Sequence, residues 1–121
     1  MISGYQIHNY IKYSYYACYE KYKEFRDCWY YLQDDLINHS KCWKDWRIQT
    51  RAIWFSNNHW RIGYTESIGS DDCVMKAKGS SDQLPTEFEG QWYHLDPNSK
   101  DWIKAGDDIA VTFKMAELFQ K

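Results

Sequence analysis

Apolar and polar residues alternate at every second position in the run that follows residue 59, which is the period of a β-strand with one buried face. Trp60, Ile62 and Tyr64 form the apolar set, so we expect them to face a core while the residues between them, Arg61 included, face water. A second run rich in aromatic and β-branched residues precedes the cluster at 56–59, whose two asparagines tolerate a positive φ in a tight turn. The stretch therefore predicts a β-hairpin.

Short strands are also expected at intervals along the rest of the chain. Gly, Pro, Asn and Asp residues separate the apolar runs at spacings of about 8–12 residues, which is typical of a small barrel or sandwich. Besides the hairpin, the expected strands lie at 2–8, 73–78, 91–95, 101–104 and 109–113. The polar stretch 33–45 predicts a surface loop or a short helical turn. We therefore expect an all-β fold of about eight short strands, as a small barrel or a two-layer antiparallel sheet.

Residues 15–37 carry two periods at once, and both interpretations stay open. One apolar stripe along a helix is predicted by residues that recur at alternating steps of four and three: Cys18, Tyr22, Phe25, Trp29, Leu32 and Leu36. The many Tyr, Phe, Trp and Cys residues argue against a helix, because they are mediocre helix formers. As strands, 15–22 and 27–32 would pair across 23–26. The alternative fold is α+β, with an amphipathic helix at 15–37.

Length and composition limit the architecture and the partners. A chain of 121 residues suits a single domain, 1–121, with one core. Seven Trp and eleven Tyr can fill that core, but their polar ends need partners or water, so some rings should lie at the surface. Fifteen basic and seventeen acidic residues nearly cancel, which argues against nucleic acid as a partner. Since no apolar run approaches the roughly 20 residues of a membrane helix, we expect no membrane insertion.

Four cysteines, Cys18, Cys28, Cys42 and Cys73, allow two disulfides in three pairings, or none. If 15–22 and 27–32 are paired strands, Cys18 comes close enough to Cys28 to form a bridge. The spacings match no zinc-binding pattern, so no structural metal is expected. Two disulfides would be ordinary in a secreted domain and four buried thiols in the cytosol, and we favour an extracellular or other oxidising compartment.

Residues capable of catalysis are present, but their arrangement matches no catalytic pattern. His39 and Cys42 stand three positions apart, although a surface histidine near a buried cysteine is the simpler interpretation. The acidic pairs at 71–72 and 107–108 lie in glycine-containing loops, where carboxylates are usually solvated rather than poised for acid–base chemistry. No phosphate-binding glycine motif is present. We therefore predict that the chain is not an enzyme and has no cofactor.

The second half of the chain carries an ordered series of aromatic and small-residue motifs. They are Ile53-Trp54-Phe55, Asn57-Asn58, Trp60-Arg-Ile-Gly63, Ile68-Gly69, Lys76-Ala77, Pro85, Trp92-Tyr93, Trp102 and Asp108-Ile-Ala-Val111. In this order the chain resembles the tryptophan-rich β-modules that recur in large proteins of protists and invertebrates. In the first half only Tyr19 and Tyr30 or Tyr31 fit the two spaced tyrosines of that family, and Cys18 stands where a glycine is common. The resemblance implies an all-β fold and no catalytic residues.

Exposed aromatic rings are the main candidates for function. Flat rings on one face of a β-module can stack on sugar rings or on a partner's side chains, while nearby Asp and Asn residues supply hydrogen bonds. Trp60, Trp92 and Trp102 are expected to fill the core instead. The candidate binding residues are Trp43, Trp46, Tyr93, Asp96 and Asn98. We predict a non-catalytic binding or assembly module that recognises protein or carbohydrate; the alternative is a small disulfide-stapled structural subunit of a larger complex.

Overall fold

A computed structural model of the chain describes residues 10–15, 28–45, 50–83, 91–104 and 111–115. These residues form a single antiparallel sheet of nine strands, together with the short 3-10 helix η3 (Thr65–Ser67). The strands are β1 (Tyr10–Tyr15), β2 (Cys28–Leu32), β3 (Trp43–Asp45), β4 (Arg51–Ser56), β5 (His59–Tyr64), β6 (Met75–Lys78), β7 (Trp92–Leu95), β8 (Trp102–Lys104) and β9 (Val111–Met115). The predicted all-β class is confirmed.

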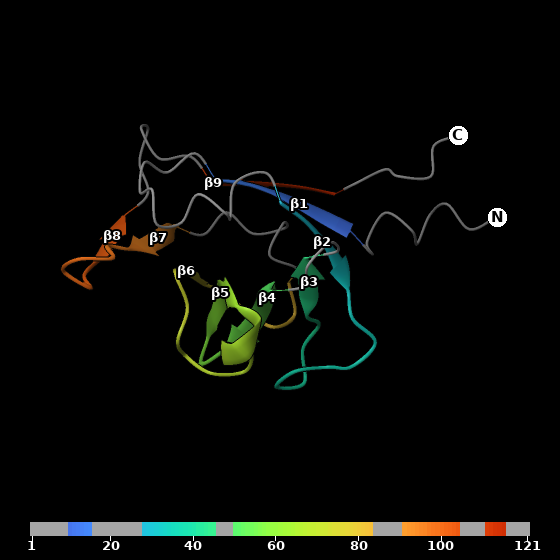
Figure 1. The fold of residues 1–121 in the computed structure, drawn as a ribbon. Coiled ribbons are helices and arrows are strands. Elements are labelled where there is room, and N and C mark those ends of the chain that lie inside the picture. The colour runs from blue at the N-terminus through green and yellow to red at the C-terminus, as the bar shows by residue number, and fades with distance from the viewer. Residues whose placement is uncertain (1–9, 16–27, 46–49, 84–90, 105–110, 116–121) are drawn as a thin grey trace.

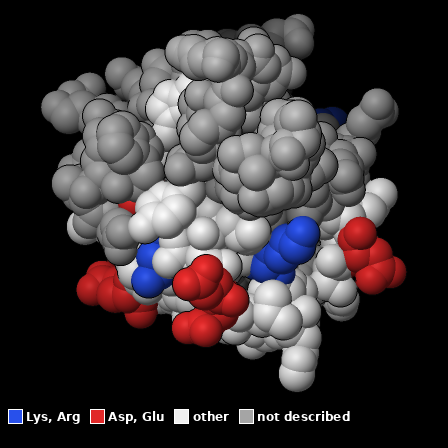
Figure 2. Space-filling model, turned by 90° about the vertical axis from the view of Figure 1, so that its right-hand side faces the viewer, with Lys and Arg blue, Asp and Glu red and all other residues white. Residues whose placement is uncertain are grey.

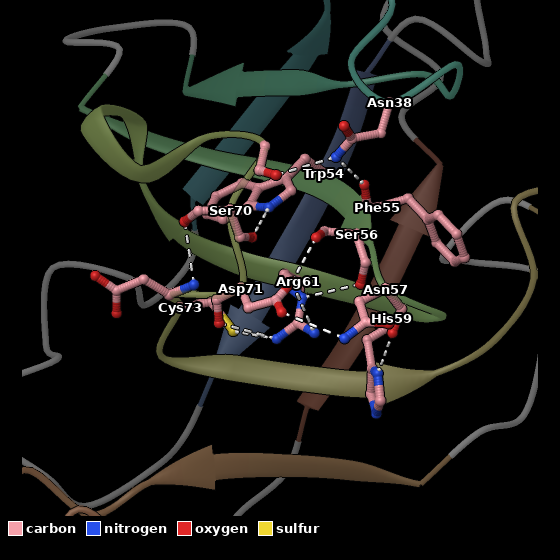
Figure 3. Close-up of polar contacts among 12 residues, drawn as sticks. Asn38, Trp54, Phe55, Ser56, Asn57, His59, Arg61, Ser70, Asp71 and Cys73 are labelled. Atoms are coloured by element: carbon pink, nitrogen blue, oxygen red, sulfur yellow. Dashed lines mark hydrogen bonds and ion pairs between the residues drawn. The ribbon is translucent and has the colours of Figure 1, made fainter.

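The sheet is a meander in which β1 to β8 lie in chain order and β9 returns to pair with β1. Its spatial order is β8-β7-β6-β5-β4-β3-β2-β1-β9, so β8 and β9 stand at its two ends. Figures 1 and 3 show that the sheet curls until β1 and β9 pass across the hairpin of β4 and β5. The strands therefore enclose an interior face and present an outer face.

The hairpin of β4 and β5 forms as predicted. Its register pairs Ser56 with His59 and leaves a two-residue turn at Asn57 and Asn58. Both asparagines have positive φ angles, 51° and 64°, which is the geometry of a type I′ turn. This turn matches the right-handed twist of the two strands, and asparagine adopts it more readily than most residues because its short polar side chain tolerates the left-handed region.

Aromatic and aliphatic side chains fill the interior face. On β3 to β7 its buried members, all on one face by the strand register, are Trp43, Ile53, Trp60, Ile62, Met75, Ala77 and Trp92. The Trp60 ring meets the Phe55 ring edge to face at 5.2 Å and lies 6.0 Å from the Trp43 ring. Trp60 and Trp92 are thus core residues, as predicted.

A buried ion pair ties β3 to β4 on the same interior face. The Nε and Nη2 atoms of Arg51 donate to the Asp45 carboxylate at 3.1 and 2.9 Å. Both side chains are almost completely buried. A buried charge is tolerated only with a close partner, so this pair selects one arrangement of β3 beside β4.

The outer face of the hairpin is also buried, which the alternation did not predict. Arg61 is only 4% exposed, and its cross-strand neighbour Trp54 is fully buried. The reason is that the segment 65–74 folds back over this face (Figure 3). There the Trp54 indole donates to the Ser70 carbonyl at 2.9 Å. The expectation that Arg61 faces water is therefore wrong.

Close packing under this segment requires a glycine at position 63. A Cβ atom there would lie 3.0 Å from Trp54 Cη2 and 3.1 Å from the Cα of Cys73. Asn38 links the covering segment to β4, since its amide donates to the carbonyls of Phe55 and Gly69 at 3.0 and 3.1 Å. Three segments distant in the sequence are thereby joined over one strand pair.

The N-terminal half differs from the sequence-based expectation in two ways. The helix alternative at 15–37 is wrong for residues 28–37, because 28–32 form β2 and pair with β1. The polar stretch 33–45 contains the strand β3 rather than only a loop. The predicted strand at 2–8 and residues 16–27 lie outside the described residues. No helix within the described ranges is long and apolar enough to cross a membrane.

The two cysteines whose side chains are described are free thiols. Cys42 and Cys73 are buried in an outer-face cluster with Ala52 and Trp54. A disulfide involving either of them is therefore not formed, and that part of the expectation is wrong. The Cys73 sulfur instead lies 3.5 Å from an Arg61 guanidinium nitrogen, which donates to it. Cys18 lies outside the described residues, and only the backbone of Cys28, in β2, is described.

Candidate functional site

The outer face of β5 to β8 carries a row of basic and aromatic side chains. In the sheet register Arg61 lies opposite Lys76, Lys76 opposite Tyr93, and Tyr93 opposite Lys104. Residues directly opposite in antiparallel strands share one face, so these side chains form a continuous row across the sheet. A second row begins with His59, which lies opposite Lys78.

A groove lies along these two rows. Its volume is about 440 Å³, which is within the usual range for small-ligand sites. The residues that line it are His59, Lys76, Lys78, Gln91, Tyr93 and Trp102. Most of them stand on hydrogen-bonded strands, so the backbone of the groove is held by the sheet rather than by long loops.

Trp102 forms an anchored wall of the groove. The half-buried indole packs against the cluster of Cys42, Ala52, Trp54 and Cys73. The ammonium of Lys76 lies 4.3 Å from the centre of the indole ring, in cation–π geometry. Since one part of the indole is anchored in the cluster, this contact holds the Lys76 charge at a defined position in the groove.

The charged residues of the strands that carry this surface are all basic. Strands β5 to β8 contain Arg61, Lys76, Lys78 and Lys104 and no Asp or Glu. Arg61 is partly neutralised by the Asp71 carboxylate, 3.5 Å from its Nη2 atom. Within the described part of the chain, neither Lys76 nor Lys78 has a carboxylate within ion-pair distance. By contrast, the face in Figure 2 carries acidic and basic side chains close to one another.

The His59 ring is oriented by the hairpin turn. Its Nδ1 atom lies 2.9 Å from the Asn57 carbonyl oxygen (Figure 3). Because a carbonyl can only accept, the proton of this hydrogen bond resides on Nδ1, which leaves Nε2 as an acceptor in the neutral imidazole. The groove therefore receives a histidine of defined orientation at the end where β5 begins.

The Asp71 carboxylate accepts hydrogen bonds from two residues of the same turn. Ser56 Oγ donates to Asp71 Oδ1 at 2.6 Å, and the Asn57 amide donates to Oδ2 at 3.3 Å. The Ser56 hydrogen bond is the largest cause that holds the pKa of the Asp71 carboxyl below its ordinary value, with a further contribution from the Arg61 charge. His59 bonds to Asn57 and Ser56 bonds to Asp71, so these residues do not form a serine–histidine relay.

The residues predicted to bind a ligand lie at different places in the structure, and only some of them are exposed. Tyr93 is half-buried and lines the groove. Trp43 is fully buried on the interior face, so the expectation that its ring is exposed is wrong. Asp96 uses its Oδ1 atom to accept from the backbone N–H of Asn98 and of Ser99, at 2.8 and 3.2 Å, as a turn-forming aspartate does. Asn98 is exposed on that turn, and Trp46 lies outside the described residues.

Four lining residues were missed from the sequence, and Trp102 was expected in the core. The missed residues are His59, Lys76, Lys78 and Gln91. A signal for two of them was present, because Lys76 and Lys78 alternate with Met75 and Ala77 on a short strand and therefore share its polar face. Their meeting with β7 and β8 depends on strand order, which the local pattern does not encode.

A second hollow, of about 340 Å³, is lined by residues of mixed charge that include Asp34, Asp35 and Lys44. Among the described residues no three His, Cys, Asp or Glu side chains lie together as metal ligands would.

Comparison of the chain with protein-family models, with curated proteins and with solved structures found no match. The resemblance to tryptophan-rich β-modules therefore stays a prediction, and the groove is the basis for a functional proposal.

Proposed function

We propose that the chain is a non-catalytic binding module and that its ligand is a glycan held in the outer groove of β5 to β8. The observation that carries this proposal is the combination of Tyr93 and Trp102 rings with Gln91 and His59 in a groove of about 440 Å³. Aromatic rings supply apolar faces for sugar rings, and amide and imidazole groups supply directed hydrogen bonds.

The distribution of apolar side chains supports a glycan over a protein partner. Protein interfaces usually have an apolar centre with aromatic anchors. In the part of the chain that is described, the exposed large aliphatic residues are Leu36 and Ile103, at 61% and 38% exposure. They stand on different segments, one before β3 and one on β8. Leu36 and Ile103 therefore do not form one broad apolar patch of the kind that a protein partner would cover.

The construction of the groove also supports binding without much reorganisation. Tyr93 stands on β7 between β6 and β8, so both of its strand neighbours restrain its backbone. Trp102 is anchored in the cysteine-containing cluster. A ligand that enters a site built on paired strands loses less free energy to ordering of the protein than one that must order a loop.

The alternative of a disulfide-stapled structural subunit has less support. Cys42 and Cys73, half of the cysteines in the chain, are free thiols buried in the outer-face cluster. Their packing explains their presence without a bridge, because a free cysteine behaves as a small hydrophobic residue.

The proposal is tested by a glycan array probed with the full chain, followed by titration of the best oligosaccharide against two tyrosine variants. Tyr93→Ala removes a ring from the groove and should weaken binding about tenfold or more. Tyr31→Ala is the matched control, since Tyr31 is a half-buried tyrosine opposite Lys44 on the distant β2–β3 pair. Equal affinity of the Tyr93→Ala variant and the parent chain, or no glycan bound at all, would refute the proposal.

A further inference from the structure

We infer that the groove selects acidic saccharides, with carboxylate or sulfate groups of the ligand placed against Lys76 and Lys78. This inference rests on the proposed glycan-binding function and adds the charge of the ligand to it. It follows from three features of the outer face: basic residues set opposite one another, lysines that pair with no carboxylate among the described residues, and the position of both lysines on one face of β6.

The first feature is the placement of basic residues across the β5–β6 pair. Arg61 lies directly opposite Lys76, and His59 lies directly opposite Lys78. Like charges at directly opposite positions destabilise an antiparallel pair. Because Asp71 already offsets part of the Arg61 charge, an anion bound in the groove would offset the charge of Lys76 that remains, whereas a neutral sugar would leave it unchanged.

The second feature is the lack of internal neutralisation at the lysines. Asp71, which pairs with Arg61 in this row, is also engaged by Ser56 and Asn57. Lys76 contacts the Trp102 ring, and within the described ranges no carboxylate pairs with it or with Lys78. As far as the described residues extend, both ammonium groups are therefore available to an anionic ligand.

The third feature is geometry. Lys76 and Lys78 point to the same side of β6, two residues apart, which separates their Cβ atoms by roughly 7 Å. Lys76 is held by Trp102, while Lys78 is exposed at the margin of the groove. Two lysines on one face of the same strand can engage two acidic groups on a saccharide, with the Tyr93 ring beside them.

The positive charge of the groove is local, because the chain as a whole carries a small negative charge. The formal net charge is −2, so the molecule has no general attraction for polyanions. Binding of an acidic saccharide would therefore depend on the groove lysines and would weaken with added salt, because the contacts are made by exposed or half-exposed charges.

The test compares three oligosaccharides of the same backbone by calorimetric titration: one with uronic carboxylates, one with sulfate esters, and one desulfated and carboxyl-reduced. Both acidic forms should bind at least about tenfold more tightly than the neutral form. The Lys78→Glu variant should lose about tenfold or more of the affinity for the acidic forms. The Lys41→Glu variant places the same charge reversal on an exposed lysine of another segment and should bind as the parent does.

The outcomes separate this inference from the proposal beneath it. If the neutral oligosaccharide binds as tightly as the acidic ones, the selection for charge is refuted while glycan binding stands. If the Lys78→Glu and Lys41→Glu variants weaken binding equally, the effect is one of total charge and the role of the groove lysines is refuted. If no oligosaccharide of either class binds, both proposals fall. Melting curves of each variant show that a loss of binding is not a loss of fold.

Discussion

The guanidinium of Arg61 donates from Nη1 to the backbone carbonyl of Asp71 at 3.0 Å, while its Nη2 atom lies 3.5 Å from the Asp71 carboxylate. Through Nε it also donates to the Ser56 carbonyl at 3.1 Å. One side chain therefore joins the end of β4 to the segment that follows η3. Because that segment covers the outer face of the hairpin, Arg61 also maintains the turn that orients His59 toward the groove.

Replacement of Arg61 by methionine should destabilise the fold by about 2–4 kcal/mol, because the carbonyls of Ser56 and Asp71 lose their charged donor at a buried site. Methionine keeps the apolar part of the side chain, so the loss reports the polar contacts more than the packing. Urea denaturation measures the free energy of unfolding. The Lys41→Met variant, at an exposed position, should change it by no more than about 0.5 kcal/mol. Equal stability of the two variants would contradict the role assigned to Arg61.

The contribution of the Asp71 carboxylate to stability should depend on pH in a defined direction. Its pKa in the folded chain is below the ordinary value of 3.8, chiefly because Ser56 donates to the ionised form. The stabilisation is therefore complete above that value and is lost as the pH falls from there through the folded-state pKa. Melting temperatures of the parent chain and the Asp71→Asn variant should differ by a constant amount near neutral pH and converge below pH 3.8. A difference that persists unchanged into strong acid would exclude this linkage.

The turn between β4 and β5 should accept glycine at position 58 but resist alanine. Asn58 has a φ of 64°, in the left-handed region that glycine adopts freely and alanine adopts at a cost of about 1 kcal/mol. The Asn58→Ala variant should therefore be less stable than the Asn58→Gly variant by about that amount in urea denaturation. Asn98→Ala is the control, since Asn98 is exposed on another turn and is not among the residues with positive φ. Similar losses at positions 58 and 98 would contradict the assigned turn.

The thiols of Cys42 and Cys73 should resist alkylation in the folded chain. Burial raises the pKa of the Cys42 thiol to about 11 and also raises the pKa of the Cys73 thiol. At pH 8 both are therefore almost entirely protonated, and the thiolate is the form that reacts. Iodoacetamide treatment followed by peptide mass spectrometry should leave both unmodified under native conditions and modify both in guanidinium chloride. Labelling of the native chain at the denatured rate would show that the outer-face cluster is open.

The strand β5 could be predicted from the sequence, whereas the strand β3 could not. The β5 strand was predicted because its apolar alternation and its Asn-Asn turn are local signals. The β3 strand was missed because Lys44 separates only Trp43 and Asp45, a run too short and too polar to register as a strand. What makes it a strand is pairing with β2 and β4 and the buried contact of Asp45 with Arg51.

The candidate site divides in the same way. Tyr93 was identified as a ring on a strand with an exposed side, and it lines the groove. The assignment of Trp43 to the surface failed because an indole beside polar residues can equally lie in the core, and only its register opposite Leu32 and Ile53 places it there. Lys76 and Lys78 become groove residues only because β6 lies beside β5 and β7, with β8 next to β7.

The sequence by itself determined the β-strand class, the tight turn at Asn57 and Asn58, and the burial of Trp60, because each of these depends on residue type and period along a short stretch. Only the tertiary structure decided that both faces of the β4–β5 hairpin are covered and that lysines of β6 share a groove with rings of β7 and β8. Those outcomes depend on which strands pair and which segment folds over them. Contacts between residues far apart in the chain are set by packing as a whole, and no local pattern carries them.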